Sequence, residues 1–422
     1  MSLISELRSK DKKQLFSTND AFTPYSTGLL PLDYANGFQA PLARDRVAPI
    51  AGVMGGTFIT IIGLSGSGKT TLADQIAYNI IRPFDDGVMI HVDIEKTALK
   101  ARIAQVTGSD PEDPRIILDK DRTSIEDVLD MIAEICNEKE SGGEKYKYTI
   151  PEEYWVVPDK PTKVYVPTVL ILDSLATFNS RERKEDTLEG QMSGGREASQ
   201  ISQFYSKCLN SMNRYNITII AVNHIKSTVD INPYQSHVPQ MMLLKQGESL
   251  PRGVAPIYLA QNIFRCNATK GNIYTIEENG FQGFMCKIQV AKTKTAFIGS
   301  EVNVCFNSEI GFDPIYTLYE FATQAGLIEG RNPYLYIKGL DTMKFNRKQF
   351  RVKFISEPEF RDGVMSIMQP YLFSLLGSKD PTGEKTTYES VDGLLSKELP
   401  EESKNEEAME DEGGKLSKKS KK

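Results

Sequence analysis

One segment of the chain combines glycines, a lysine and two threonines at the spacing that binds nucleoside triphosphates. It reads Gly63-Leu-Ser-Gly-Ser-Gly-Lys-Thr-Thr71, and it lies between a strand-like apolar run and an amphipathic run. Backbone N–H groups can curl around phosphate oxygens there, and the N-terminal end of the following helix attracts the same anion. Lys69 would face the β and γ phosphates, and Thr70 would hold Mg²⁺. We expect ATP to contact Gly63, Ser65, Gly66, Ser67, Gly68, Lys69, Thr70 and Thr71.

Three further polar residues come at the ends of apolar runs. A carboxylate at the position of Asp173 can hold the metal through water, and Glu95 could polarise the attacking water as a general base. His224 follows a third run and would lie beside the γ phosphate. Because parallel strands end at one edge of a sheet, these side chains are expected to meet there. Taken singly, each also fits an ordinary polar residue at a strand end.

A pair of cations ends a later run. Lys292 and Lys294 are two residues apart, so in an extended chain they point the same way. They could form a two-pronged contact to an anion, although such pairs are often simply solvated.

The elements that must position these residues alternate along the chain. Continuous apolar runs indicate strands buried on both faces of a parallel sheet, and helix-like stretches separate them. The expected strands are Thr57–Ile62, Val88–Asp93, Val169–Asp173 and Ile217–Asn223, extended by 261–267, 283–291 and 301–306. The expected helices are 69–81, 97–106, 124–138, 196–213 and 314–325, the last ended by Gly326. This order predicts an α/β fold with a mixed, mainly parallel sheet.

Composition sets limits on the class of protein. The 422 residues include five scattered cysteines and three histidines, which argues against a disulfide framework or a zinc site and favours a reducing compartment. No apolar run is long enough to span a bilayer, so we expect a cytoplasmic protein without a membrane partner. The net charge is −6, so a nucleic-acid surface would have to be local.

Four regions are predicted. Residues 1–45 form a short helix and arm, in which Phe16 has little local core and is expected to pack into a neighbouring subunit as a polymerisation residue. Residues 46–330 form the core, with a surface insertion at 141–167 and long irregular segments at about 180–195 and 225–256. A small extension follows at 331–378. Residues 379–422 read as a disordered tail, with eight acids and two lysines between Lys397 and Glu412 and then five lysines between Lys415 and Lys422.

The motifs together resemble the RecA family of recombinases, from about Ser26 to Glu329. The resemblance rests first on the glycine-rich segment Gly63–Thr71, which we call the P-loop. It rests also on the segments Ser-Thr-Gly-Leu-Leu-Pro-Leu-Asp at 26–33, Val-Asp-Ile-Glu at 92–95, Leu-Asp-Ser at 172–174, Val-Asn-His at 222–224 and Ala-Lys-Thr-Lys at 291–294. His224 stands where many bacterial members carry Gln, and the phage UvsX-like branch also tolerates His there. Arg102 stands where bacterial members place an aromatic residue over the adenine.

The resemblance implies functions for further residues. Lys292 and Lys294 would reach the ATP of the neighbouring subunit in a helical filament. The two irregular segments would be the DNA loops. The residues carried over as DNA contacts are Met192, Arg196, Ser199, Lys226, Arg252 and Gly253.

We therefore expect an ATP- and Mg²⁺-dependent recombinase and DNA-dependent ATPase. It would form filaments on single-stranded DNA, pair that strand with homologous duplex, and work with single-strand-binding and loader proteins. One alternative is a ring-forming helicase of the DnaB type, and another is a recombinase paralogue that binds DNA without productive turnover. The roughly 50 residues before the core are too few for the N-terminal domain of such a helicase.

Overall fold

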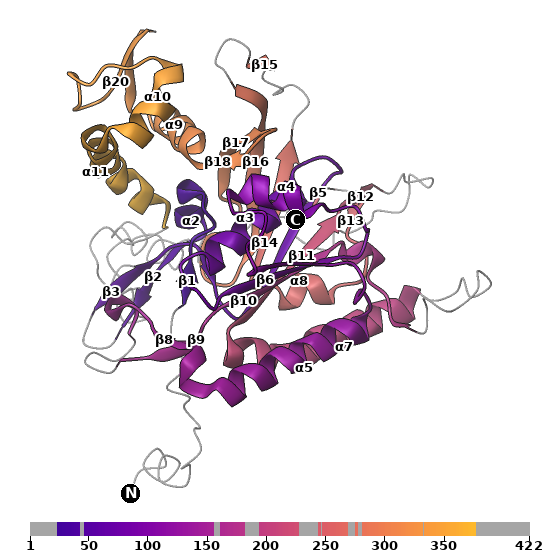
Figure 1. Ribbon diagram of the computed structural model, residues 1–422. Coiled ribbons are helices and arrows are strands. Elements are labelled where there is room, and N and C mark those ends of the chain that lie inside the picture. Colours follow the sequence, from indigo (N-terminus) through magenta and orange to yellow (C-terminus); the bar gives the residue numbers. More distant parts are fainter. Residues whose placement is uncertain are drawn as a thin grey trace, which may run out of the picture. The chain divides into compact units, whose positions relative to one another are not determined.

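The computed structural model describes most of the chain between residues 23 and 376 (Figure 1). The chain divides into a unit at Met1–Gly377 and a unit at Ser378–Lys422. Phe16, Met192 and the charged tail lie outside the described residues, and only the backbone of Arg196 is described. The described ranges are 23–42, 46–155, 161–181, 194–227, 244–245, 247–268, 275–276, 281–331 and 333–376.

A mixed sheet forms the centre of the described part, in the strand order β18-β17-β16-β14-β5-β11-β10-β6-β7, with β15 paired to β16. The strands from β14 to β7 run parallel, and β16, β17 and β18 are antiparallel to their neighbours. The predicted α/β fold with a mainly parallel sheet is confirmed. The parallel strands are β5 (Phe58–Gly63), β6 (Val88–Asp93), β7 (Ile116–Asp119), β10 (Thr168–Asp173), β11 (Ile217–His224) and β14 (Asn262–Ala268). The others are β15 (Thr275–Ile276), β16 (Phe281–Thr293), β17 (Glu301–Asn307) and β18 (Gly311–Asp313).

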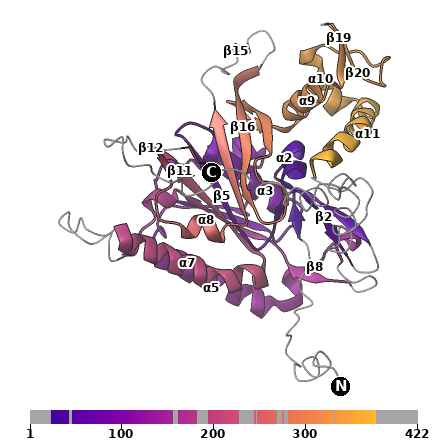
Figure 2. The same cartoon turned by 180° about the vertical axis from the view of Figure 1, so that it is seen from behind.

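Helices cover both faces of the sheet because alternate strand residues point to opposite sides. Ile59 and Ile171 pack with α3 and α4 on one face, whereas Phe58 and Leu170 pack with α5, α7 and α8 on the other. Figure 2 shows α5 and α7 side by side on that second face. The bounds are α3 (Lys69–Ile81), α4 (Lys100–Thr107), α5 (Ile125–Gly142), α7 (Gly194–Tyr215) and α8 (Ala255–Leu259).

Two helix boundaries differ from the prediction for reasons visible in the hydrogen bonds. Helix α4 begins at Lys100 rather than at 97, because the amides of Thr97 and Ala98 donate to the carboxylate of Asp93 and hold a turn. Helix α5 begins after Ser124, whose hydroxyl forms a capping box with Asp127, and it runs on to Gly142.

The insertion after α5 packs against the N-terminal part of the core. It contains η1 (Gly143–Tyr146), β8 (Lys147–Thr149), η2 (Glu152–Tyr154) and β9 (Lys163–Tyr165), with β8 antiparallel to β9. The hydroxyl groups of Tyr148 and Tyr25 lie 2.9 Å apart. The N-terminal part of the core contains β1 (Pro24–Tyr25), α2 (Leu30–Ala35), β2 (Phe38–Pro41), β3 (Val47–Ile50) and β4 (Val53–Met54).

The segment after β18 has its own hydrophobic cluster. Leu318 and Ala322 of α9 pack there with Phe350 of α10 and Val364 of α11, so the packing does not break at residue 331. Gly326 follows α9 with a φ of 67°, as expected for a residue that ends a helix. The bounds are α9 (Pro314–Gln324), β19 (Ile328–Arg331), β20 (Tyr334–Ile337), α10 (Arg347–Ser356) and α11 (Pro358–Leu375). In the part of the chain that is described, no helix is long and apolar enough to cross a membrane.

Candidate nucleotide site and nucleic-acid-facing segments

The P-loop connects β5 to α3, as the sequence predicts. Gly66 and Gly68 have φ angles of 74° and 84°, a left-handed region that glycine adopts without strain. A Cβ on Gly68 would also lie 2.8 Å from the ring of Phe312. Both the backbone conformation and the lack of space therefore exclude larger residues at this position. The backbone can therefore fold tightly between the strand and the helix, as a phosphate cradle requires.

Lys69 opens α3 with its side chain turned back onto the loop. Its Nζ donates to the carbonyl of Leu64 at 2.8 Å, and the residue is buried. Burial lowers the pKa of Lys69, while the nearby carboxylates of Asp173 and Glu95 act in the opposite direction. The ammonium is thus held at the P-loop, close to where phosphate oxygens would lie.

Thr70 and Asp173 meet directly. The Thr70 hydroxyl donates to Oδ2 of Asp173 at 2.6 Å across the gap between α3 and β10. Burial raises the pKa of Asp173, and the hydrogen bond from Thr70 lowers it. Among the described residues, no group of three His, Cys, Asp or Glu side chains could hold a metal. A hydroxyl and one carboxylate fit Mg²⁺, which commonly completes its coordination with phosphate oxygens and water.

Glu95 and His224 lie at the same edge of the sheet. Oε1 of Glu95 accepts a hydrogen bond from the Ser174 hydroxyl at 2.5 Å and lies 3.6 Å from Nε2 of His224. The strand register explains this, because His224 pairs with Gly63 and Asp173 lies opposite Asp93. Ser174 belongs to the Leu-Asp-Ser segment at 172–174, but sequence reasoning gave it no role of its own.

Arg102 lies away from this cluster of carboxylates. Its guanidinium donates to the carbonyl of Ser308 at 2.9 Å and to Oε1 of Gln105 at 2.9 Å. It therefore ties α4 to the turn between β17 and β18. Gln75 of α3 donates to the carbonyls of Ile310 and Phe312 and fixes the same turn from the P-loop side.

Lys292 and Lys294 lie at the other end of the strands from the P-loop. Lys292 pairs with Ile263, which pairs with Thr60, three residues before Gly63. Three strand residues span about 10 Å, so the two lysines are remote from the P-loop of their own subunit. Nζ of Lys292 donates to the carbonyls at the end of α8, those of Ile257, Tyr258 and Ala260. Burial and the charge of Lys294 lower the pKa of Lys292 to about 8.

Both long segments leave the sheet edge that holds the P-loop. The short 3-10 helix η3 (Leu175–Thr177) follows Asp173, and the second segment follows β11, where Ile225 donates to the carbonyl of Gly63. Strand β12 (Lys226–Ser227) pairs with β13 (Glu248–Ser249) and closes the base of the second segment. Lys226 and Ser199 are exposed.

Arg252 is turned inward. Its guanidinium donates to the carbonyl of Ala176 at 2.7 Å and to Oδ1 of Asn179 at 3.0 Å, and it pairs with Glu197. A DNA contact by Arg252 requires these bonds to open. Gly253 has a φ of 75°, and a Cβ there would lie 2.8 Å from the Cβ of Ala198. The end of the second segment is therefore packed against the flanks of the first.

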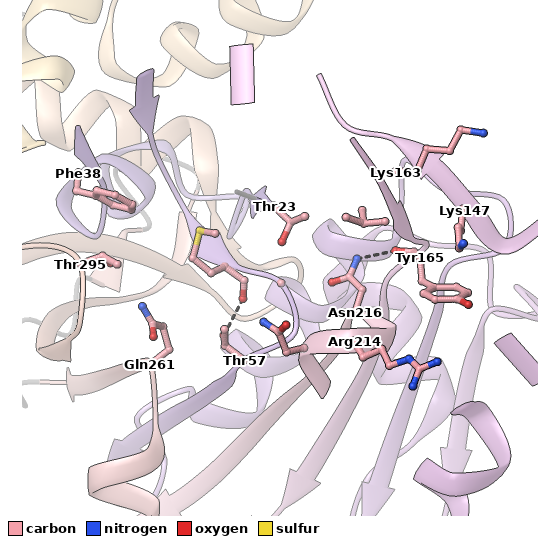
Figure 3. Close-up of a pocket in the computed structure, with 14 residues that line it drawn as sticks. Thr23, Phe38, Thr57, Lys147, Lys163, Tyr165, Arg214, Asn216, Gln261 and Thr295 are labelled. Atoms are coloured by element: carbon pink, nitrogen blue, oxygen red, sulfur yellow. Dashed lines mark hydrogen bonds between the residues drawn. The ribbon is translucent and has the colours of Figure 1, made fainter. Parts of the chain in front are cut away.

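A cavity of about 460 Å³ lies at the opposite end of the strands, beside the segment that carries Lys294 (Figure 3). Gln261 and Thr295 line it together with three cations, which are Lys147, Lys163 and Arg214. Each cation is in an ion pair, the two lysines with Glu144 and Arg214 with Glu140. The cavity is polar, and its three cations pair with two carboxylates.

Comparison with known proteins gives distant matches. No family model matches the chain. "Protein RecA" of Aquifex aeolicus (strain VF5) is 22% identical over 326 residues, which cover 76% of this chain and 80% of that protein. "Protein RecA" of Chlamydia muridarum (strain MoPn / Nigg) is 26% identical over 298 residues, which cover 69% of this chain and 70% of that protein. The chain is thus weakly similar to RecA proteins over most of its length.

Proposed function

We propose that this protein is an ATP-dependent recombinase of the RecA type, most like the phage UvsX-like branch. It would form filaments on single-stranded DNA and exchange strands with homologous duplex in the cytoplasm. One observation carries the proposal. The P-loop, Asp173, Glu95 and His224 converge at one edge of the sheet, and both long irregular segments leave from that edge. The similarity to two RecA proteins supports the same function.

The residues at this edge divide the work of ATP hydrolysis. Lys69 would turn from the Leu64 carbonyl to the phosphates, and Thr70 and Asp173 would hold Mg²⁺, which neutralises phosphate charge when bound. Glu95 takes the proton of the attacking water, with its carboxylate oriented by the Ser174 hydroxyl. His224 lies close enough to Glu95 to report the state of the γ phosphate to the second segment, which starts at the next residue.

The cations at the far end of the strands suit a role in a neighbouring subunit. Lys292 and Lys294 lie at the opposite end of the strands from their own P-loop, so a contact to phosphate would be made to the ATP of another copy. Large apolar side chains are exposed close by, which are Tyr258 at 65%, Phe297 at 61% and Ile298 at 50%. Exposed aromatic side chains beside functional cations are typical of an interface. We therefore assign this face to the contact between subunits.

A groove of about 540 Å³ offers a place for the N-terminal arm of a neighbour. Its apolar lining includes Ile117 of the edge strand β7 and Ile135 of α5. Its charged lining consists of four acids and two bases, which are Asp85, Asp86, Glu134, Glu138, Arg115 and Lys139. The arm has the complementary sequence Lys12-Lys-Gln-Leu-Phe16. We expect Phe16→Ala and Ile117→Lys each to weaken assembly while ATP still binds, as measured by sedimentation and nucleotide titration. Full assembly of both variants would exclude this contact.

DNA would contact residues around the two segments, which are Met192, Arg196, Ser199, Lys226 and Gly253. Arg252 would join them once its internal bonds open. Contacts to the sugar-phosphate backbone of DNA carry little information about base sequence. A recombinase requires this, because the single strand that it binds, and not the protein, selects the homologous duplex. Single-strand-binding and loader proteins are the expected partners.

Electron microscopy with single-stranded DNA and a slowly hydrolysed ATP analogue tests the assembly. Helical filaments support the recombinase, whereas closed rings favour a helicase of the DnaB type. Strand exchange between circular single strands and linear duplex tests the reaction itself. DNA binding with neither ATP turnover nor strand exchange would favour the paralogue without productive turnover.

A further inference from the structure

The insertion after α5 builds one wall of the polar cavity beside the segment that carries Lys294 (Figure 3). Strand β8 contributes Lys147 to this wall, β9 contributes Lys163 and Tyr165, and the end of α7 contributes Arg214. The described lining of the cavity contains these three cations and no aspartate or glutamate. The cavity therefore presents positive charge to a molecule that enters it.

The acids that pair with these cations lie outside the lining and are well exposed. Glu144 pairs with Lys147 at 3.0 Å and with Lys163 at 2.8 Å, and its side chain is 66% exposed. Glu140 pairs with Arg214 at 2.8 Å and is 57% exposed. Exposed ion pairs contribute little stability, because water solvates both partners. With two carboxylates for three cations, one positive charge is in excess, and an entering anion can exchange with either carboxylate at little cost.

Asn216 fixes the position of this wall. Its Nδ2 donates to the carbonyl of Tyr165 at 2.8 Å and to the hydroxyl of Tyr25 at 2.7 Å. A carbonyl can only accept, so these bonds set the orientation of the amide. Oδ1 of Asn216 faces Gly55, where a Cβ would clash with it, and both residues line the cavity. This oxygen has no hydrogen-bond partner among the residues that the structure describes. The wall thus has a fixed shape and an acceptor that lacks a donor.

The end of the cavity away from the cations carries groups that can recognise a base. Figure 3 shows Phe38, Gln261 and Thr295 there, apart from Lys147 and Lys163. The side-chain amide of Gln261 forms no hydrogen bond within the described part of the chain. An amide can both donate to and accept from the edge of a base, and an aromatic ring offers a surface on which a base stacks. Cations at one end and an amide with an aromatic ring at the other suit the two ends of a nucleotide.

We propose that this cavity binds a nucleoside monophosphate, with its phosphate held by the three cations of the lining and its base beside Gln261 and Phe38. The cavity volume of about 460 Å³ lies within the roughly 300–1,000 Å³ that is usual for small-molecule sites. The proposal also gives the insertion a role, since its strands β8 and β9 supply two of the three cations.

The cavity is separate from the proposed ATP site. Thr57, which lines the cavity, directly precedes β5, whereas the P-loop follows β5 at the other end of the strand. The inference therefore goes beyond the proposed function and does not rest on it.

Isothermal titration calorimetry of the full chain tests the site, with the four ribonucleoside monophosphates as separate probes at low salt, where exposed charges are least screened. At least one of them should bind. Inorganic phosphate and the matching uncharged nucleoside should each bind at least about 10-fold more weakly, because each lacks one end of the contacts. Absence of binding by all four at about 1 mM would overturn the proposal. Equal affinity for inorganic phosphate would overturn it as well.

Lys163→Ala should weaken binding of the mononucleotide by about 10-fold or more, because a hydrogen bond between two charged groups is lost. Lys287→Ala is the matched control. Lys287 is 46% exposed against 55% for Lys163, and it pairs with Glu301 at 2.7 Å, but it is not part of the described lining. Both lysines are on the surface, so both variants should fold. The same affinity in the two variants would refute the phosphate contact and with it the proposal.

Two further variants test each end of the ligand. Glu144→Gln should strengthen binding, because the acid that competes for two lysines is neutralised, and a purely structural role of the ion pairs predicts no such gain. Gln261→Leu should weaken binding of the mononucleotide by roughly 3–10-fold and leave inorganic phosphate unaffected. Weaker binding in Glu144→Gln, or unchanged mononucleotide affinity in Gln261→Leu, would contradict the assignment.

Lys69→Ala separates this site from the proposed ATP site. The affinity for the mononucleotide should be the same in this variant as in the wild type. Loss of binding would trace it to the P-loop and overturn the proposal. A chain that binds the mononucleotide through Lys163 but binds no ATP would refute the proposed function and support this inference.

Discussion

The contact between Arg252 and Glu197 supports a prediction about how the two long segments are held together. The side chain of Arg252 is 7% exposed, and the partners of its guanidinium include Glu197, the carbonyl of Ala176 and the side chain of Asn179. Removing one partner of a buried ion pair costs about 3–5 kcal/mol. Glu197 is 22% exposed and would regain water, so we expect Arg252→Ala to lower the free energy of unfolding by about 3 kcal/mol.

A second substitution separates the contribution of the Arg252 side chain to stability from that of its backbone conformation. Arg252 has a φ of 76°, a conformation that costs a residue other than glycine about 1–2 kcal/mol. Arg252→Gly should therefore be about 1 kcal/mol less destabilising than Arg252→Ala. A double-mutant cycle with Glu197→Ala should give a coupling energy of about 2 kcal/mol.

Urea unfolding of the full chain, followed by circular dichroism, gives these free energies if the slopes of the variants agree. Hydrogen exchange adds a local readout, since amides near Ala176 should exchange faster in Arg252→Ala. The reasoning would be refuted if Arg252→Ala stayed within about 0.5 kcal/mol of the wild type, the range of ordinary surface substitutions. If the effects of Arg252→Ala and Glu197→Ala on the free energy of unfolding were additive, the ion pair between the two residues would contribute nothing to stability.

The remaining predictions concern ATP turnover, measured by phosphate release. Lys69→Ala should lower the rate by roughly 100-fold or more, whereas Glu95→Gln should still bind ATP and assemble, and loss of ATP binding in that variant would exclude Glu95 as the base. Subunits carrying Lys69→Ala, mixed with subunits in which both Lys292 and Lys294 are alanine, should regain activity at mixed interfaces. No recovery at any ratio, with co-assembly confirmed, would place the lysines outside a neighbour's site. Because the pKa of Lys292 is lowered to about 8, its charge is lost as the pH rises through that value, and turnover should fall there. Lys292→Arg should keep turnover to higher pH, and identical pH profiles would contradict this role.

The strands that carry the candidate site were predictable because they are buried on both faces. Strands β5, β10 and β11 are largely apolar runs; β10 ends at Asp173, β11 ends at His224, and β5 leads into the loop before Lys69. Strand β7 was not predicted. It has four residues, only Ile116 is fully buried, and it lies at the edge of the sheet, so its sequence carries little of the apolar signal.

Sequence spacing predicted less about side chains whose partners come from distant segments. Lys292 was expected to belong to a pair of solvent-facing cations, and the spacing did not predict that its Nζ donates to the carbonyls at the end of α8. Arg252 looked like an exposed loop cation, and only its bonds to η3 and α7 show that it is internal.

The sequence alone determined the P-loop, the alternation of the buried central strands with helices, and the edge at which Asp173, Glu95 and His224 meet. These features follow from local spacing and from the rule that parallel strands end together. The tertiary structure decided which polar groups are buried against one another, as Asp74 and His91 are across α3 and β6. Those contacts join residues that are far apart in the chain, and no periodicity in the sequence encodes the distance between two side chains on different elements.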